Sequence, residues 1–469
     1  MLAELDFMTA MELRRLVAAK KVSPVELTRR ALDKALATQA TLNAFFILMP
    51  EKAMAAAEVA ENAVMQGAPL GLLHGIPFSA KDLIAVAGER FCSGSRTMDK
   101  NVAAVDAPAI ERAKAAGAIL IGKTTTSEFG CKPVGDSPLT GITRNPWNLA
   151  KTPGGSSAGA AASVAAGITP FALGTDGGGS IRIPCALTAL SGLKGTFGRV
   201  PVWPTSATPT LAHVGPIARN IKDAALLFCA IAGNDPRDPF AIAGPVPDVL
   251  GAAEASLQGL RIAWSPTLGY ARPTAEVADT VTKAVRKLED LGAQIDLVEN
   301  VFDTDPADLW TAEFYAGVGT RLRSFIETQR DLLDPAVASI LTEALAQDMR
   351  TYYQTVFERY SLRDKIRTLF ETYDILVSPT LPVSSLDVGR NVPLGYEDRN
   401  LVSWVYYTYP FNLTGQPAAS TCAGFGSDGM PIGMQIVGRL LGEADVVRTA
   451  AAFERIEHSW LRTPPGWAD

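Results

Sequence analysis

Histidine and cysteine are scarce in this chain, and neither occurs with the spacing of a metal site. Only three histidines and five cysteines stand among its 469 residues. No Cys-x-x-Cys pair and no His-x-x-x-His pair is present, so neither a metal nor any other cofactor is expected. The cysteines are odd in number and scattered, which is typical of thiols kept reduced in the cytoplasm and not of a disulfide framework.

The chain also lacks the charge and hydrophobic patterns of nucleic-acid-binding and membrane proteins. Its net charge is −6, which argues against binding to nucleic acid. No basic segment followed by an apolar stretch opens the sequence. The one long uncharged run, residues 158–174, is mostly alanine and glycine and contains Pro170. It is too short and too weakly hydrophobic to cross a bilayer, so we expect a buried helix that leads into a buried strand.

Two common nucleotide-binding and hydrolase motifs are missing as well. There is no Gly-x-x-x-x-Gly-Lys-Ser/Thr phosphate loop and no Gly-x-Ser-x-Gly turn. A Ser-His-Asp triad built on His74 or His213 stays open as an alternative, although a single histidine is more often structural.

The chain does contain two clusters of glycine and serine, residues 154–159 and 174–182. Ser156 and Ser180 lie in these clusters, 24 positions apart. Glycine lets the backbone approach a ligand closely, and free backbone amides can hold the oxyanion that forms during acyl transfer. A serine beside such amides is the arrangement that a nucleophilic serine requires.

Lys81 follows the apolar segment Gly75-Ile76-Pro77-Phe78 and is the candidate general base. A lysine acts as a base only when it is neutral, which requires burial or a nearby positive charge to lower its pKa. Its apolar neighbours are compatible with burial. The alternative from the residues alone is an exposed Lys81–Asp82 pair at the end of a strand.

Helix-like and strand-like segments alternate along the chain and predict an α/β fold. Capping-box spacing at Thr9–Glu12 and Ser23–Glu26 predicts two N-terminal helices. A helix near residues 157–166 precedes a strand at residues 171–173. Asn-Asp-Pro, Asp-Pro and Gly-Pro dipeptides and tripeptides between residues 234 and 254 mark a break in this pattern.

Three blocks of sequence together resemble the amidase signature family of serine hydrolases. They are Gly75-Ile76-Pro77-x-x-x-Lys81-Asp82, Gly154-Gly155-Ser156-Ser157 and Asp176-x-Gly178-Gly179-Ser180-Ile181-Arg182-x-Pro184. Shorter blocks extend the resemblance to about residue 440 in the order of the family: Gly122-Lys123-Thr124, Gly192-Leu193-Lys194, Gly215-Pro216-Ile217-Ala218-Arg219, Asn412-Leu413-Thr414-Gly415-Gln416-Pro417 and Gly433-Met434-Gln435.

The resemblance implies one domain over residues 1–469, with a large mixed, mostly parallel β-sheet sandwiched between helical layers. Within it we expect an N-terminal helical segment at 1–70 and a catalytic core at 71–230. A variable region at 235–345 is left open as a separate lobe that shapes the substrate site. Residues 346–469 are expected to complete the sheet. By analogy with relatives, we expect a homodimer that acts on a small-molecule amide.

Carried over position by position, the resemblance also assigns the site. Ser180 is the expected nucleophile, Ser156 the bridging serine and Lys81 the base, with a cis peptide bond leading into Ser156. The other expected residues are the oxyanion donors Gly177, Gly178 and Gly179, joined by the backbone amide of Ser180, the bracing residues Ser157, Thr175, Asp176 and Arg182, and the substrate contacts Phe129, Gly130, Cys131 and Trp203. A purely structural Asp176–Arg182 ion pair is an equal alternative.

The resemblance implies amide hydrolysis without naming the amide. Aromatic residues in segments that could rim the site favour an aryl or otherwise apolar substrate, so we expect small carboxamides, N-acyl amines or anilides. These aromatics are Phe129, Trp203, Trp310, Phe314, Tyr315, Trp404, Tyr406 and Tyr407. The alternatives are the glutaminase component of a tRNA-dependent amidotransferase and a non-catalytic anion-binding module. Gly177 stands where relatives often carry a larger residue, which predicts a wider or looser site floor.

Overall fold

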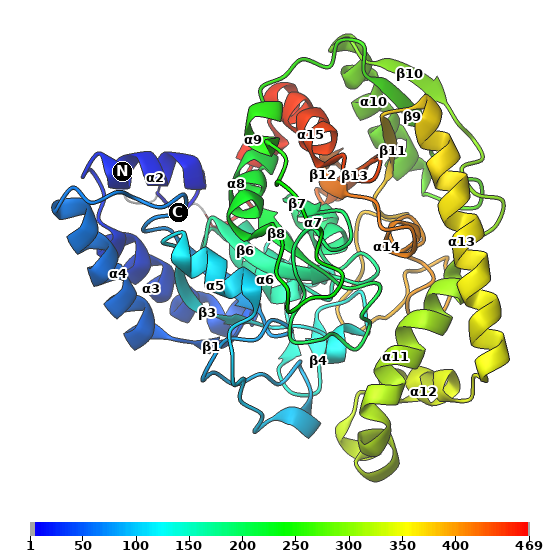
Figure 1. Cartoon of the computed structure of the whole chain (residues 1–469), viewed down its shortest axis with the longest axis horizontal. Helices are drawn as coiled ribbons and strands as arrows, with labels where there is room; N and C mark the ends of the chain where they lie inside the picture. The colour runs from blue at the N-terminus through cyan, green and yellow to red at the C-terminus, as the bar shows by residue number, and fades with distance from the viewer. Residues whose placement is uncertain (1–4, 468–469) are drawn as a thin grey trace.

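An eleven-stranded mixed sheet runs through the computed structural model, which describes residues 5–467 (Figure 1). Helices cover both of its faces. Across the sheet the strands follow in the order β1 (Phe45–Leu48), β3 (Ile119–Thr124), β2 (Pro77–Lys81), β6 (Phe171–Asp176), β8 (His213–Ala218), β7 (Ser191–Lys194), β12 (Ala418–Phe425), β13 (Pro431–Gly438), β11 (Ile375–Pro379), β9 (Arg261–Trp264) and β10 (Gln294–Leu297). Strands β4 (Asp136–Ser137) and β5 (Gly141–Ile142) form a separate small pair.

The predicted mixed sheet between helical layers is confirmed, but its strands are not mostly parallel. Among the described strands, only β2 with β3 and β6, and β9 with β10 and β11, are parallel neighbours. The other neighbours are antiparallel. Strands β12 and β13 show why: the five residues between Phe425 and Pro431 join them as a hairpin. A parallel pair needs a long crossover connection, which so short a link cannot provide.

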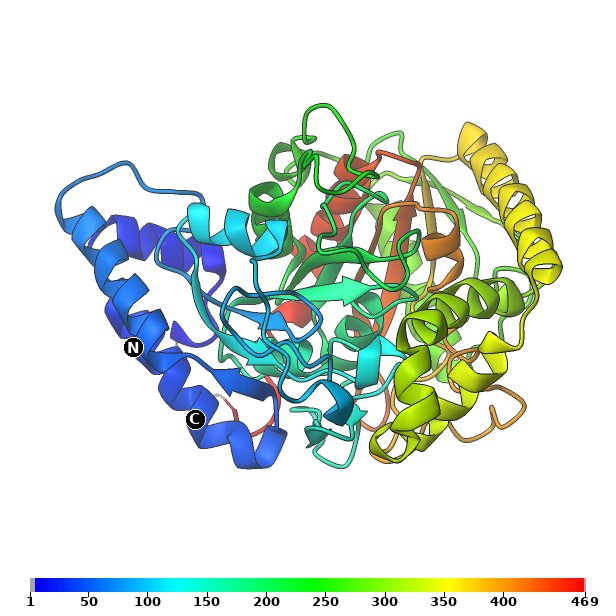
Figure 2. The same ribbon diagram turned by 60° about the horizontal axis from the view of Figure 1, so that its bottom comes forward.

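The helices are distributed along the whole chain, and they cover the sheet and both ends of the molecule (Figure 2). They are α2 (Ala10–Ala18), α3 (Pro24–Leu42), α4 (Pro50–Met65), α5 (Pro108–Ala115), α6 (Ala158–Ala165), α7 (Arg182–Thr188), α8 (Ile221–Ile231), α9 (Val249–Ala252), α10 (Ala275–Asp290), α11 (Ala307–Thr328), α12 (Pro335–Leu345), α13 (Met349–Thr372), α14 (Pro410–Leu413) and α15 (Glu443–Glu457). No helix within residues 5–467 combines the length and the apolar character needed to cross a membrane.

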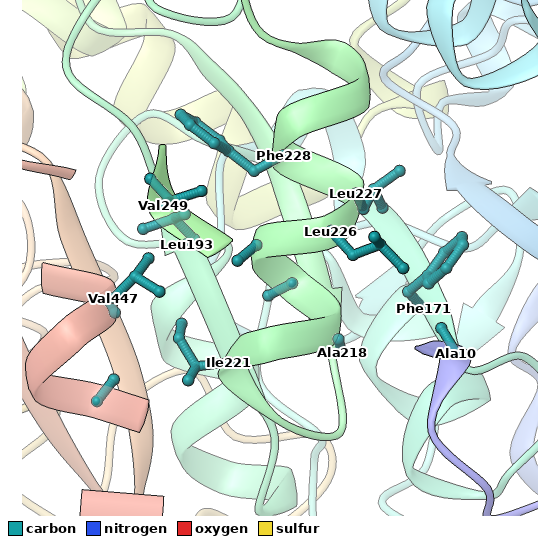
Figure 3. Packing of buried hydrophobic residues seen from close by; sticks show 14 of the residues in the cluster. Ala10, Phe171, Leu193, Ala218, Ile221, Leu226, Leu227, Phe228, Val249 and Val447 are labelled. Atoms are coloured by element: carbon teal, nitrogen blue, oxygen red, sulfur yellow. The ribbon is translucent and has the colours of Figure 1, made fainter. Parts of the chain in front are cut away.

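Strand β6 shows how the two faces of the sheet are filled. Phe171 and Leu173 pack into the large core under α8, α10 and α15, while Ala172 between them packs against α6 and α7. Successive side chains of a strand point to opposite faces, so this alternation follows from the geometry of an extended chain. Figure 3 shows Phe171, Leu226, Leu227 and Phe228 gathered around α8.

Helix α6 confirms the expectation of a buried helix and strand in the uncharged run at residues 158–174. All eight of its residues are buried, and β6 follows directly. Small side chains allow this helix to lie between the sheet and the layer outside it. Gly159 shows how tight the fit is, because a Cβ there would come within 2.1 Å of the Ala44 carbonyl oxygen.

The N-terminal helices begin where the capping residues predict. Thr9 accepts a hydrogen bond from the Glu12 backbone, and Glu12 accepts from the Thr9 backbone in return. Ser23 accepts from the amides of Val25 and Glu26 at the start of α3. These two helices and α4 occupy the blue end of the molecule in Figure 2.

The region between residues 235 and 345 contributes to two parts of the molecule. Its strands β9 and β10 extend the edge of the main sheet. Its helices α11 and α12 pack against each other, with α13 beside them, at the end opposite the N-terminal helices (Figure 2). A second hydrophobic core lies there and includes Trp310, Phe314 and Tyr315. The proposed division of the chain into segments stays a prediction.

Candidate active site

Lys81 is the last residue of β2 and is completely buried. Its Nζ lies 2.7 Å from Ser156 Oγ and 2.8 Å from Thr175 Oγ1. The alternative of an exposed Lys81–Asp82 pair is therefore wrong. Asp82 instead pairs with Lys123 of the neighbouring strand at 2.5 Å.

Burial controls the protonation of Lys81. Desolvation lowers the pKa of its amine well below the ordinary value, and the charge of Asp176 only partly opposes this. The amine of Lys81 therefore stays neutral at a lower pH than the amine of an exposed lysine would. A neutral amine has one lone pair and two N–H groups, so it can accept from the Ser156 hydroxyl while it donates to Thr175.

The backbone at Ser156 holds the serine against Lys81. The peptide bond between Gly155 and Ser156 is cis, as the resemblance implies. The space around this peptide bond is filled. A Cβ on Gly155 would lie 2.4 Å from the Val134 carbonyl oxygen, and a Cβ on Gly130, which lies beside Ser156, would lie 3.2 Å from Ser156 Oγ. Only glycine at these two positions leaves room for the turn and for the Ser156 hydroxyl.

Ser157 and Thr175 connect the two serine clusters. The Ser157 hydroxyl donates to the Thr175 carbonyl at 3.2 Å and accepts from the Thr175 amide at 3.3 Å. The Ser157 amide donates to the Ser180 carbonyl at 3.3 Å. These bonds place Ser156 and Ser180 at one cavity, which both residues line.

The loop between β6 and α7 carries Ser180 and the expected oxyanion donors. Within residues 5–467, the amides of Gly177, Gly178 and Ser180 have no hydrogen-bond acceptor. The amide of Gly179 instead donates to Asp176 Oδ1 at 2.8 Å. The expectation that Gly179 supplies an oxyanion donor is therefore corrected, because its N–H is committed to the carboxylate that shapes the loop.

Asp176 and Arg182 form a buried ion pair behind this loop. Arg182 donates to both carboxylate oxygens, at 2.9 and 3.0 Å. Its remaining contacts are the Thr408 carbonyl at 2.8 Å, Gln435 Oε1 at 2.7 Å and Asn412 Oδ1 at 2.6 Å. Burial alone would raise the pKa of Asp176, but Arg182, with Lys194 and Asn412, holds it below the usual value.

This network accounts for Arg182 and Asp176 as bracing residues and as a structural pair at once. The carboxylate accepts from Gly179 and Ile181, and the guanidinium ties the same loop to the segment around residue 408. Asn412 and Gln435 belong to the shorter sequence blocks, whose order along the chain was a signal for their importance. No spacing between residues in the sequence indicated that Asn412 and Gln435 contact Arg182.

We expect Arg182→Met to lower the free energy of unfolding by about 3–5 kcal/mol, because it leaves the Asp176 charge buried and unpaired. Urea denaturation of the two proteins measures the difference. Arg323→Met is the matched control, because Arg323 forms an exposed pair with Glu327 and such pairs contribute at most about 1 kcal/mol. Equal losses in the two variants would contradict the bracing role.

Phe314 of α11 fills the space beside Gly177. A Cβ built on Gly177 would lie 2.8 Å from Phe314 Cε2. The prediction of a wider or looser site floor at Gly177 is therefore wrong. The missing side chain of the glycine is replaced by an aromatic ring from a distant helix, and Trp310 stacks on that ring with centroids 4.5 Å apart.

The cavity beside Ser156 and Ser180 has a volume of about 510 Å³. Of the predicted substrate contacts, Phe129, Gly130 and Trp203 line it. Cys131 does not, because it is buried with its carbonyl accepting from the Tyr315 hydroxyl at 2.8 Å. The apolar lining residues that sequence reasoning missed are Leu83, Ile84, Phe91, Met98, Val202, Val214, Val318, Leu322 and Phe325.

The other aromatic residues expected at the rim have different places. Trp404, Tyr406 and Tyr407 are fully buried in the second core and do not line the cavity. Their clustering in sequence reflects packing and not recognition. Phe314, by contrast, does line the cavity.

The histidines do not form a Ser-His-Asp triad. His213 lines the cavity, but its Nδ1 lies 2.8 Å from the Leu211 carbonyl oxygen and no described carboxylate group contacts the ring. Burial and the charge of Lys194 lower the pKa of His213 well below the usual value. His74 lies elsewhere, with Nε2 2.9 Å from the Ala60 carbonyl oxygen.

The chain is similar to curated proteins along almost its whole length. An acylamidase from Rhodococcus erythropolis is 35% identical, with 98% of each chain covered. The A component of the glutamyl-tRNA(Gln) amidotransferase of Gloeobacter violaceus is 34% identical, with 97% of each chain covered. The two identities are too close to separate these activities.

Solved structures and a family model agree with this similarity. A bacterial aryl acylamidase of the amidase signature family superimposes with a TM-score of 0.91 at 30% identity, with 97% of each chain covered. The family model for amidases matches residues 26–447. The chain therefore belongs to the amidase signature family, and it is a hydrolase that acts on amide bonds.

Proposed function

We propose that this protein is an acylamidase that hydrolyses N-acyl arylamines through an acyl-enzyme on Ser180. One observation carries the proposal: a buried lysine lies 2.7 Å from a serine hydroxyl, at a cavity that the second serine also lines. Lys81, Ser156 and Ser180 would then act as base, proton relay and nucleophile, roles that need neither a histidine nor a metal.

Acylation begins with proton transfer toward Lys81. The neutral amine accepts the proton of Ser156, and Ser156 accepts the proton of Ser180 as the Ser180 oxygen attacks the carbonyl carbon. The Thr175 hydroxyl, 2.8 Å from Nζ, orients the amine. The relay then returns the proton to the amide nitrogen, so that a neutral amine leaves and not an amide anion.

The carbonyl oxygen becomes negative when the tetrahedral intermediate forms. The amides of Gly177, Gly178 and Ser180 are the open donors of the loop, and one oxyanion-hole donor typically lowers a barrier by about 3–4 kcal/mol. Water then attacks the acyl-enzyme by the same relay, and Ser180 leaves with its proton restored.

The lining of the cavity supports an apolar, aromatic substrate. Phe129, Trp203, Phe314 and Phe325 surround a space of about 510 Å³, which is in the range of small-ligand pockets. Two of the similar proteins carry names that agree with this choice, an acylamidase and an aryl acylamidase.

The glutaminase alternative rests on the similarity to the A components of glutamyl-tRNA(Gln) amidotransferases. Free glutamine carries an α-ammonium and an α-carboxylate, which need charged or polar partners in a binding site. Among the described lining residues only Asp176 and Arg321 are charged. Asp176 is bound by Arg182, so the cavity offers no free acidic partner for the ammonium within the described residues.

A substrate panel tests the proposal. With acetanilide and glutamine assayed side by side, we expect a kcat/KM at least about 100-fold higher for the anilide, because the α-ammonium of glutamine would be buried without an acidic partner. The anilide assay detects released aniline and the glutamine assay detects released ammonia. Both assays use the same enzyme sample, so the two kcat/KM values can be compared directly. A higher kcat/KM for glutamine would replace this proposal with the glutaminase function.

A further inference from the structure

Helix α11 lies against the loop that carries Ser180, although the two are more than a hundred residues apart in sequence. Its Trp310 donates a hydrogen bond from Nε1 to the Gly177 carbonyl oxygen at 2.8 Å. Trp310 is only 4% exposed. Its indole stacks between Phe314 and Tyr409, with ring centroids 4.5 and 5.8 Å away.

The glycine loop fits these neighbours with no space to spare. A Cβ on Gly178 would lie 2.6 Å from Trp310 Cζ2, and one on Gly179 would lie 2.3 Å from Thr408 Oγ1. Gly179 also has φ +135°, a conformation that residues with side chains rarely adopt. The loop is therefore pressed directly onto the indole and the threonine.

Two carbonyl groups of this loop are held by side chains from distant segments. Trp310 holds the Gly177 carbonyl, and the Thr408 hydroxyl holds the Gly178 carbonyl at 2.6 Å. A peptide unit is planar and trans, so its C=O and the following N–H point in opposite directions. Fixing the Gly177 carbonyl therefore fixes the direction of the Gly178 N–H, which points away from the indole.

We propose that Trp310 is a positioning residue of the oxyanion hole. Its indole N–H orients the peptide between Gly177 and Gly178, so that the Gly178 amide is aimed at the oxygen of the tetrahedral intermediate. This rests on the proposed function, because it assigns the Gly178 amide to that oxyanion. The brace comes from α11, within the region 235–345 that the family resemblance marks as variable.

The effect of this brace is confined to the transition state. Donors that are already oriented stabilise developing charge without reorganising during the reaction. The hydrogen bond from Trp310 also polarises the peptide and strengthens the Gly178 N–H as a donor. An interaction of this kind changes kcat and leaves ground-state binding, and hence KM, nearly unchanged.

Trp310→Phe removes the donor and keeps an aromatic ring in the stack. For acetanilide we expect kcat to fall roughly tenfold, less than the loss of a direct oxyanion donor, with KM within about twofold. Phenylboronic acid forms a tetrahedral adduct with a nucleophilic serine, so its inhibition constant should rise by the same factor. The inhibition constant of aniline, which makes no such adduct, should stay constant.

Trp147→Phe is the matched control, because Trp147 also donates from its indole, to the Thr188 carbonyl at 2.9 Å at the far end of α7. We expect it to change neither kcat nor the boronate constant. If Trp310→Phe does not fold, β-(3-benzothienyl)alanine at position 310 replaces only the indole N–H with sulfur and preserves the shape of the ring.

Two results would overturn the positioning role. One is an unchanged kcat and boronate constant in the Trp310 variant. The other is a raised KM at constant kcat, which would make Trp310 a wall of the substrate site. Failure of the proposed function is a separate outcome, read from wild-type protein. If the wild-type protein does not hydrolyse anilides but a fluorophosphonate labels Ser180, the rate of labelling replaces kcat as the measure of the Trp310 effect. If the fluorophosphonate does not label the wild-type protein either, both the proposed function and the positioning role are rejected.

Discussion

Replacing Ser180 with alanine is expected to reduce amide turnover at least about 10⁴-fold, because removal of the nucleophile leaves only binding and oxyanion stabilisation. The fold should persist. The Ser180 carbonyl, which accepts from the Ser157 amide, is a backbone group and remains in the variant. Anilide hydrolysis and covalent labelling by a fluorophosphonate measure the loss, and the thermal midpoint checks the fold.

Ser420→Ala provides the control for this variant. Ser420 is also a buried serine, but its hydroxyl contacts Thr380 within the sheet at 2.9 Å and does not line the cavity. We expect it to retain labelling and turnover. Substantial turnover in Ser180→Ala, or labelling at another residue, would show that the nucleophile has been assigned incorrectly.

Lys81→Met is expected to cause a comparable loss, again at least about 10⁴-fold, because Ser156 would have no base to accept its proton. Lys81→Arg keeps the positive charge but cannot lose a proton at accessible pH, so it should be equally inactive. A role for Lys81 that depended only on charge predicts activity in the arginine variant. Comparing kcat for the two variants separates these explanations.

The pH dependence of the wild-type enzyme tests the same base. Turnover requires the neutral amine, so activity should fall as the pH drops through the lowered pKa of Lys81. A profile that stays flat until other groups unfold the protein would argue against a lysine base.

Stability should depend on pH through the same group. The folded pKa of Lys81 is lowered, so between that pKa and the ordinary value of about 10.4 the unfolded state binds more protons than the folded state. The free energy of unfolding contributed by this group therefore rises with pH through that window. Lys81→Met should lose this dependence and unfold at a higher urea concentration near neutral pH. A lower midpoint there would contradict the burial of an uncharged amine.

Local sequence was sufficient for the residues whose role depends on their immediate neighbours. The residues around Lys81 left an exposed Lys81–Asp82 pair open, and only the family resemblance made Lys81 the base. Ser156, by contrast, lies in a turn that only glycines at 154 and 155 permit. For this reason the strand ends, the capped helices at Thr9 and Ser23, and the buried helix α6 were predictable from short segments of the chain.

Contacts between distant segments were not predictable in the same way. The spacing of residues in the sequence does not indicate that the Gly179 amide donates to Asp176. It also does not indicate that Phe314 lies beside Gly177. Cys131 was expected at the substrate from the family resemblance, yet it is buried in the second core. The mostly parallel sheet implied by the family resemblance was also wrong, and the pattern of apolar segments could not correct it, because a short loop and a helical crossover both appear in sequence as breaks between such segments.

The sequence by itself determined the chemical groups of the site: two serines in glycine-rich turns, a lysine that follows an apolar strand, and an acidic residue six positions before an arginine. Only the tertiary structure decided which amides of the glycine loop have no hydrogen-bond acceptor, which side chains pack against that loop and which side chains line the cavity. The physical reason is that composition and local geometry establish which hydrogen-bond donors, acceptors and side chains a segment contains. Packing against Trp310, Phe314, Thr408 and Asn412, each more than a hundred residues away, decides which of those groups are used up within the fold.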